Sequence, residues 1–441
     1  MKNFTLFEVA LIILVTLAGI AWSIMFNILL LIGFMPGFLF LFYLCFKKGN
    51  ALRELFQYAL QGFMKTKEVM LILTLVGLLL PSWQAAGTID GMVQLILSFM
   101  NPDYFFISAF LSTLLVSMIL GTSVGSLSAI GIPIIGAAHT LGLSVELTAG
   151  ALVSGAFVGD RTSLFSSANQ LLSNTLEINR KLFQKTLWKS GSVGIGLSLL
   201  FFFIADIQLK EKMDSLMVSK FEGNIIVMIP IILLILLALI RFNIKTCFMV
   251  SIAAALVIMV FYQGVPLQFD VLWNGTKTSG GGLEKMISLV AFIGLAGAYN
   301  GIVEALGIFH SFLTRWLQSS ETLLAKTWKT MCATMFISLL ACNQTLPIIL
   351  TGRTFLSDWT KSKHRDQLAR VMADSSMLFA GMIPWSVLAI MCSTILRVPI
   401  LDYLIYAIYL WSLPFVTLIF SYHMTRRNRN TSNIPEVSTS L

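Results

Sequence analysis

Long apolar segments without a charged residue alternate with short polar segments along the whole chain. Two of them, Val9–Phe46 and Tyr104–Val145, can each hold two membrane crossings, because a helix needs about 20 residues to cross a bilayer. The other segments have roughly the length of one crossing: Val69–Ile89, Ser190–Ala205, Gly223–Ile240, Thr246–Phe269, Met286–Val303, Thr330–Gly352, Ser375–Leu396 and Tyr403–Thr425. The pattern predicts an all-α polytopic membrane protein with about 12 transmembrane helices, and not a β-barrel, whose strands would form alternating segments of about ten residues.

Two stretches interrupt this pattern with glycines and polar residues at membrane depth. Gly121–Gly136 is rich in Gly and Ser, and Ala341–Gly352 begins with a polar group that includes Asn343 and Gln344. Unwound backbone is tolerated at this depth only where protein or a water-filled cavity satisfies its polar groups. We therefore predict two broken or re-entrant segments that face ions or substrate.

The composition agrees with a membrane protein, since 57% of the residues are hydrophobic, 12% are charged and the mean hydropathy is +0.85. The net charge of +9 does not indicate a nucleic-acid partner, because the basic residues fall between the apolar segments, where they set membrane topology. The five cysteines show no metal-ligand spacing and are expected to pack as small apolar residues.

The chain also contains an internal repeat. At one offset of 214 residues, a proline, an acid and a hydroxyl all match: Pro133-Ile134-Ile135 with Pro347-Ile348-Ile349, and Asp160-x-Thr162-x-Leu164-Phe165 with Asp374-x-Ser376-x-Leu378-Phe379. The repeat predicts an N-terminal helix pair with a cytoplasmic loop, a first transport repeat, a connecting helix pair, a second inverted transport repeat and a disordered basic and polar cytoplasmic tail. Their expected bounds are 1–68, 69–222, 223–285, 286–425 and 426–441.

The distribution of basic residues predicts how the repeats are oriented. If Gly121–Gly136 and Ala341–Gly352 both cross the membrane, the repeats are inverted, with 23 Lys and Arg residues on the cytoplasmic side and 6 outside. If both segments dip back instead, the numbers are 19 and 10. The positive-inside rule favours crossing, and both termini are cytoplasmic in either case.

The segment Thr148–Asn174 begins with an apolar run of mostly small residues, and this run ends at a charged pair, Asp160 and Arg161. An acid within a transmembrane segment is costly and usually functional, and hard cations such as Na+ prefer oxygen ligands. We expect Asp160 to bind a cation or a proton with the help of the side chains that follow it: Thr162, Ser163, Ser166, Ser167 and Asn169. In the alternative, Asp160 and Arg161 are structural groups at a helix end and the hydroxyls serve helix packing, although neighbours in sequence do not face each other on a helix.

The second repeat supplies the other half of the predicted site. Asp374 is expected to act together with Ser375, Ser376 and Trp385, while the alternative makes Asp374 a helix-capping or first-turn acid. The two interrupted segments contribute further candidate ligands: Gly121, Thr122, Ser123, Asn343, Gln344 and Thr345. Gly121–Gly125 also matches the G-x-S-x-G motif of hydrolases, but that motif follows a strand and here an apolar helix precedes it.

At these motifs the sequence resembles the NhaC family of bacterial Na+/H+ antiporters. The family's first signature, Gly-Thr-Ser/Ala-x-Gly followed by Ser-Gly-Ala-x-x-Gly-Asp-Lys-x-Ser, is similar to Gly121–Gly125 and Ser154–Ser163. Its second, Leu-Pro-Gly-Arg-x-Phe followed by Glu-Asp-x-Gly and Ile-Pro-Trp-Asn, is similar to Leu350–Phe355, Ala373–Ser376 and Ile383–Ser386. In the family, the first signature continues with a second acid beyond the residues quoted, and that position is occupied by Ser167 in this sequence.

The resemblance implies a secondary active transporter of the bacterial plasma membrane that exchanges Na+ for H+ by alternating access. Asp160 and Asp374 would bind Na+ or H+, with Ser163 as a further Na+ ligand, and no cofactor other than the coupling ions is expected. The expected partners are the lipid bilayer, Na+ and H+, with a homodimer left open and no nucleic acid. The alternative is a Na+- or H+-coupled transporter or exchanger of a small organic acid or amino acid, whose anionic group would meet half-helix N-termini. A membrane enzyme or receptor is disfavoured by the repeat.

Overall fold

The computed structural model describes residues 4–26, 28–210, 224–266, 269–275, 282–308, 322–361 and 364–432. Within these ranges the regular structure is helical throughout, which confirms the predicted class. The first half contains α1 (Leu6–Met25), α2 (Leu30–Lys47), α3 (Leu52–Ala85), α4 (Thr88–Phe99), α5 (Phe105–Leu120), α6 (Ser123–Ser126), α7 (Ile132–Thr140), α8 (Val145–Thr162), α9 (Ser167–Thr175) and α10 (Arg180–Lys210). A π-helical turn, η2 (Leu127–Gly131), joins α6 to α7, and a 3-10 turn, η1 (Pro102–Tyr104), precedes α5.

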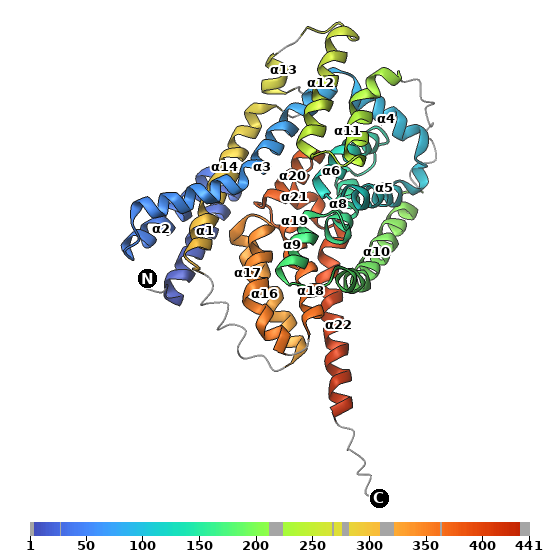
Figure 1. Ribbon diagram of the computed structural model, residues 1–441. Helices are drawn as coiled ribbons and strands as arrows, with labels where there is room; N and C mark the ends of the chain where they lie inside the picture. Colours follow the sequence, from blue (N-terminus) through green and yellow to red (C-terminus); the bar gives the residue numbers. More distant parts are fainter. Residues whose placement is uncertain are drawn as a thin grey trace, which may run out of the picture.

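The connecting region and the second half are also helical in the described residues. They contain η3 (Ile225–Met228), α11 (Ile229–Leu239), α12 (Ile244–Phe261), α13 (Phe269–Asn274), α14 (Leu283–Ala305), α16 (Leu323–Ala341), α17 (Thr345–Lys361), α18 (Arg365–Ala373), α19 (Ser376–Met382), α20 (Val387–Leu396), α21 (Ile400–Leu404) and α22 (Ile408–Ser432). Figure 1 shows α22 extending away from the body of the protein towards the C-terminus. The helix continues past Arg426, where the sequence predicts a disordered tail to begin, and residues 433–441 lie outside the described residues.

Seven helices in the described part of the chain are long and apolar enough to cross a membrane, or up to nine if each of two bent helix pairs is one span. The predicted number of about 12 is therefore not confirmed. Helices α8, α16 and α22 also have at least 18 residues but are not among the seven. Their sequences contain many small, polar or basic residues, which lower the hydropathy by which spans are recognised.

The first interrupted segment is shorter than the sequence predicts. The break is confined to Gly121 and Thr122, and the chain then continues through α6, η2 and α7 as one helical segment, Ser123–Thr140, of 18 residues. This length is sufficient for a crossing, as the positive-inside rule favours. The glycines and serines of this segment are accommodated in a helix that is 67% buried, where neighbouring protein surrounds the backbone.

Corresponding helices of the two predicted repeats pack on each other. Helices α3 and α14 begin the repeats and lie side by side (Figure 1), and α10 packs on α22, which ends the second repeat. Gly62 of α3 faces Gly297 and Gly301 of α14 so closely that a Cβ added to Gly62 would lie 2.1 Å from the Gly297 carbonyl oxygen. Small residues allow this approach between helices. Matching helices can contact each other in this way beside a two-fold axis, and the inverted repeat itself stays a prediction.

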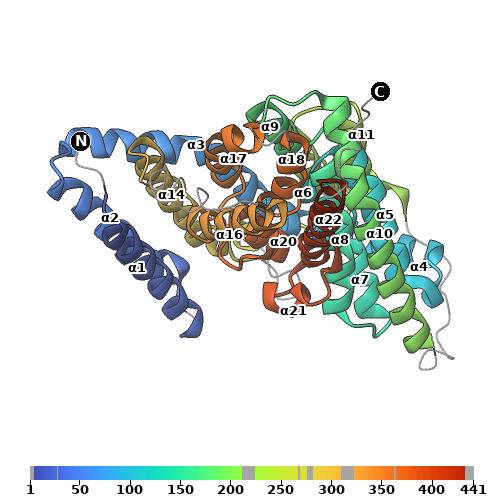
Figure 2. The ribbon, with the colours of Figure 1, turned by 90° about the horizontal axis from the view of Figure 1, so that it is seen from below.

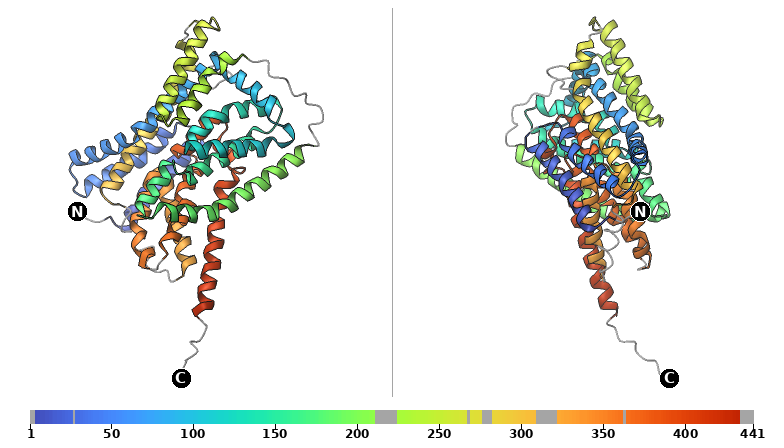
Figure 3. Two further views of the ribbon diagram at one scale, coloured as in Figure 1. Left: turned by 45° about the vertical axis from the view of Figure 1, so that its right-hand side comes forward. Right: turned by 90° about the vertical axis from the view of Figure 1, so that its left-hand side faces the viewer.

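The N-terminal helices lie to one side of this arrangement. Figure 2 shows α1 and α2 as a pair at the edge of the protein, and α2 packs on α14. Figure 3 gives two side views in which the helices of both repeats form one elongated body. Residues 52–68, predicted as part of a cytoplasmic loop, belong to α3, because Leu55, Ala59 and Gly62 form a buried face against α14.

Candidate functional site

The small residues of Ser154–Gly159 place the end of α8 directly against α5. Gly159 lies so close to α5 that an added Cβ would be 2.1 Å from the Ser117 carbonyl carbon. The Ser117 hydroxyl donates to the Gly155 carbonyl at 2.9 Å and accepts from the Gly159 N–H group at 3.1 Å. This close packing fixes the last turn of α8, which contains Asp160 and Arg161.

The first helix break lies beside the turn that follows α8. Gly121 ends α5 with a φ of +69°, and a Cβ at this position would lie 2.6 Å from the backbone of Phe165. The positive φ and the lack of space for a Cβ both require glycine at position 121. The Ser163 hydroxyl donates to the Met118 carbonyl at 2.7 Å and accepts from the Phe165 N–H group at 3.2 Å. Ser163 therefore satisfies a carbonyl at the end of α5, which lacks an intrahelical partner.

The second repeat has the same arrangement at its own break. Cys342 ends α16 in the left-handed region, with a φ of +54°, and its carbonyl accepts from the Val387 N–H group at 2.8 Å. The indole of Trp385 donates to the Leu339 carbonyl at 2.7 Å. In both halves, the segment that follows the acid therefore binds the exposed carbonyls at the end of the broken helix. The indole N–H group of Trp385 is thus bound to a backbone carbonyl, and the predicted contact of Trp385 with substrate stays a prediction.

Asp160 connects the two breaks. Its side chain is 7% exposed. One carboxylate oxygen accepts from the Gln344 amide at 3.2 Å, and the backbone N–H group of Ser123 also interacts with the carboxylate. Gln344 is the last residue of the break in the second repeat, whereas Ser123 follows the break in the first. No ion pair to Asp160 occurs among the described residues.

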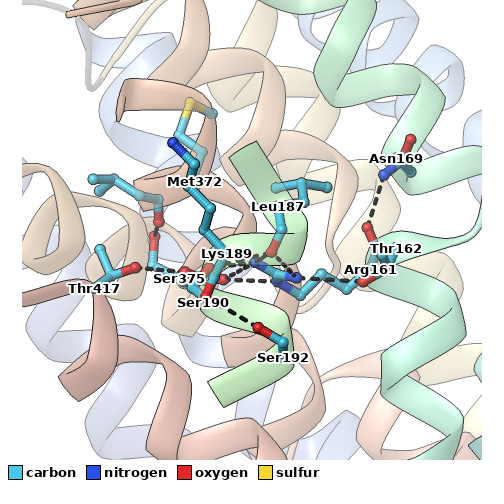
Figure 4. A network of polar contacts seen from close by, with 12 residues as sticks. Arg161, Thr162, Asn169, Leu187, Lys189, Ser190, Ser192, Met372, Ser375 and Thr417 are labelled. Carbon is cyan, nitrogen blue, oxygen red and sulfur yellow. Dashed lines mark hydrogen bonds and ion pairs between the residues drawn. The ribbon is translucent and has the colours of Figure 1, made fainter. Parts of the chain in front are cut away.

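Arg161 points away from Asp160 and binds the acid of the other repeat. Its Nε donates to Asp374 Oδ1 at 2.7 Å, its Nη2 forms an ion pair with the same oxygen, and both side chains are 0% exposed. The Thr417 hydroxyl donates to Asp374 Oδ2, so both carboxylate oxygens are occupied. Figure 4 shows the Arg161 side chain extending from the end of α8 towards Ser190 and Thr417.

The arginine is itself fully engaged in this network. Its guanidinium donates to the Leu187 carbonyl at 3.2 Å and to the Ser190 hydroxyl at 2.8 Å, both on α10. A buried pair of this kind is costly to break from one side, since removing one partner leaves an uncompensated charge worth about 3–5 kcal/mol. The network joins α8, α10, the α18–α19 junction and α22. In this structure Asp374 is held as half of an ion pair.

The remaining predicted ligands mostly bind backbone groups or side chains near them. Thr162 accepts from Arg161 at 3.3 Å, and the Asn169 amide donates to the Arg161 carbonyl at 2.8 Å. Two of the predicted ligands cap helices: the Ser166 hydroxyl accepts from the Asn169 N–H group, and the Asn343 side-chain oxygen accepts from the Leu346 N–H group. The hydroxyls of Ser375 and Ser376 each donate to the carbonyl four residues earlier. Ser167 and Thr345 are exposed first residues of α9 and α17. Thr122 is partly buried at the first break.

Ser190 and Thr417 belong to the network but are not among the predicted residues. Each is one of several hydroxyl residues on its helix, α10 or α22, and nothing in its local sequence distinguishes it from a packing residue. The described residues contain no group of three or more His, Cys, Asp or Glu side chains that could hold a metal ion. A cation at Asp160 would therefore take its other ligands from amide, hydroxyl or backbone oxygens.

Comparison with known proteins agrees with the motif resemblance. The Na+/H+ antiporter family matches residues 199–424, just over half of the chain. The chain is 27% identical over 378 residues to the Na+/H+ antiporter NhaC of Alkalihalophilus pseudofirmus, covering 80% of this chain and 81% of that protein. It is 26% identical to NhaC of Bacillus subtilis, covering 82% and 85%. A malate-2H+/Na+-lactate antiporter of the same species is 25% identical, covering 91% of both chains.

These matches, together with the helical spans, indicate a multi-pass transporter of the plasma membrane and not an enzyme. The family match includes Asp374 and the second break, while the relatives extend over four fifths of the chain. The chain belongs to the Na+/H+ antiporter family, as a divergent member similar to NhaC.

Proposed function

We propose that this protein exchanges Na+ for H+ across the plasma membrane and that Asp160 is the group that binds either ion. One observation carries the proposal: Asp160 is a buried carboxylate without a cationic partner among the described residues, and it lies where the two helix breaks meet. Asp374 is buried as well, but Arg161 and Thr417 occupy it. We therefore assign ion binding to Asp160 and a positioning role to Asp374.

A lone buried carboxylate can couple the two ions. The charged form is costly in a low-dielectric interior unless a cation or a proton neutralises it. Asp160 would thus change its exposure from one side of the membrane to the other mainly when it carries Na+ or H+. Because one carboxylate binds one of the two at a time, movement of Na+ in one direction is coupled to movement of H+ in the other.

The neighbouring groups fit Na+ better than they fit a soft metal. In the structure the Gln344 side-chain amide donates a hydrogen bond to Asp160. Rotation of this amide would turn its oxygen towards the carboxylate and offer a ligand to Na+. Backbone and hydroxyl oxygens at 121–123 are further oxygen donors, the type that hard cations bind. The Arg161–Asp374 pair would keep the end of α8 in register with α10 and α22 while the site changes occupancy.

A second candidate is Na+- or H+-coupled exchange of a small organic acid. One observation favours it: a relative of which this chain covers 91% is named for exchange of malate and lactate. An amino acid is the other anionic substrate that the sequence leaves open. The cytoplasmic location of both termini and a homodimer remain predictions from the sequence.

The experiment is Na+-dependent dissipation of a pH gradient in proteoliposomes that contain the purified protein. We expect NaCl alone to dissipate the gradient and Asp160→Asn to reduce the rate to the level of empty liposomes. Asp402→Asn, which alters an exposed acid at the start of α21, is the control and should keep the activity. Exchange that persists in Asp160→Asn would refute the assignment, whereas a strict requirement for lactate or malate would favour the second candidate.

A further inference from the structure

A second buried arginine lacks the partners that Arg161 has. Arg370 lies in the last turn of α18 and is 3% exposed. Its Nε and Nη2 atoms are buried without a hydrogen-bond partner, and no ion pair joins it to any described residue. Its guanidinium lies over the Phe420 ring of α22, 5.2 Å from the ring centre. A cation–π contact satisfies neither of the two N–H groups.

The surrounding charges do not neutralise Arg370. The charged groups close enough to interact with it electrostatically are Asp374, Asp366 and Arg161. Both oxygens of Asp374 are already bound by Arg161 and Thr417, and Asp366 is only partly buried and accepts from Gln367 at 2.9 Å. The fully buried set of Arg161, Asp374 and Arg370 therefore carries a net positive charge.

Unpaired polar atoms also gather on the helix that packs against α18. On α17, the hydroxyls of Thr351 and Thr354 and the indole N–H of Trp359 are buried without partners. Hydroxyl and indole groups can donate hydrogen bonds to an anion. Buried donors in native proteins nearly always find a partner, so unsatisfied donors on two helices that pack on each other need an explanation.

We propose that Arg370 binds a small oxyanion where α18 meets α22. The Nε and Nη2 atoms form one edge of the guanidinium, which matches two oxygens of a carboxylate or phosphate in a bidentate contact. Such an anion would neutralise the buried positive charge and satisfy both unpartnered atoms. The position has no counterpart in the first repeat, where Ala156 occurs at the matching offset. The site shares no residue with the contacts of Asp160, so it stands whether or not Asp160 carries Na+.

The test measures thermal stability of the purified full-length protein with three sodium salts at equal ionic strength. We expect lactate or phosphate to raise the apparent Tm by a few degrees relative to chloride, because a ligand that binds the folded state stabilises it. The comparison of lactate with phosphate identifies which oxyanion is preferred. Arg370→Gln should weaken the affinity for the oxyanion by about tenfold or more. Arg370→Lys should weaken the affinity less, since Lys keeps the charge but loses the bidentate edge of the guanidinium.

Arg353→Gln is the matched control, because Arg353 is an exposed arginine on α17 and its replacement should leave the effect intact. Asp160→Asn should also retain it, which separates this site from the proposed exchange activity. Without oxyanion, Arg370→Met should raise the apparent Tm, since it removes an unpaired buried charge. The proposal fails if no oxyanion stabilises the wild type beyond chloride, if Arg370→Gln retains the full effect, or if Arg370→Met lowers the Tm because Arg370 is paired within the chain.

Discussion

Two acids at matching positions of the repeat, Asp160 and Asp374, have opposite electrostatic surroundings. Asp374 is completely buried and both of its oxygens are bound, one by Arg161 and the other by Thr417. Asp160 is almost as buried, but its neighbours are the Gln344 amide and the Ser123 backbone. The same residue type thus forms half of an ion pair in one repeat and, in the other, a carboxylate with no cationic partner among the described residues.

Arg161 is the origin of this difference. It follows Asp160 in sequence, but neighbouring side chains on a helix point in different directions, so it reaches an acid of the other repeat instead. Its counterpart in the second repeat is Ser375, whose hydroxyl donates to the Val371 carbonyl of its own helix. The second repeat therefore offers Asp160 no basic residue at the position that matches Arg161. One difference between the repeats, Arg161 against Ser375, thus separates an acid held in an ion pair from an acid that we propose binds the ions.

The largest expected effect comes from removing the arginine. Arg161→Met should lower the free energy of unfolding by about 3–5 kcal/mol, because it leaves Asp374 buried and unpaired. Thermal unfolding of the detergent-purified protein measures this loss. Arg161→Met combined with Asp374→Leu should recover most of it, since both charges are then removed. A single variant as stable as the wild type would mean that Asp374 is neutral in the folded protein, which removes the contrast between the acids.

The next effect tests the surroundings of Asp160. Gln344→Leu should raise the Na+ concentration for half-maximal exchange by about fivefold, because it removes a hydrogen-bonding group worth about 1 kcal/mol at the carboxylate. The apparent Tm should change little, in contrast to Arg161→Met. Na+ titrations of pH-gradient dissipation in proteoliposomes measure the concentration. An unchanged value would show that Gln344 does not contribute to the ion site.

The smallest effect concerns Ser163, which the sequence places among the Na+ ligands. Ser163→Ala should destabilise the protein by about 1 kcal/mol, since the Met118 carbonyl loses a hydrogen bond, while the Na+ dependence stays the same. Thermal unfolding and Na+ titration of the same preparation separate the two outcomes. A reduced Na+ affinity with unchanged stability would restore Ser163 as a ligand and extend the site of Asp160 to the turn after α8.

Several features of the site could be predicted from the sequence because they depend on local chemistry. Gly121 and the polar group at 342–345 indicate breaks in otherwise apolar helices, and the structure has a break at each place. Asp160 can be recognised because an acid at the end of an apolar run costs free energy in a membrane and is usually functional. The hydrogen bonds of Ser163, Ser166 and Ser376 to backbone groups could not be predicted, because a hydroxyl that binds the backbone and one that binds an ion have the same local sequence.

The sequence by itself determined that this is a multi-pass helical membrane protein of the Na+/H+ antiporter family, because the lengths of apolar segments and the spacing of motifs are properties of the chain alone. Only the tertiary structure decided which acid is paired. Arg161 and Asp374 are 213 residues apart in the chain, and Thr417 and Ser190 reach the pair from two further helices. Such contacts depend on how the two halves pack, and a buried charge takes its partner from whatever the packing brings within reach.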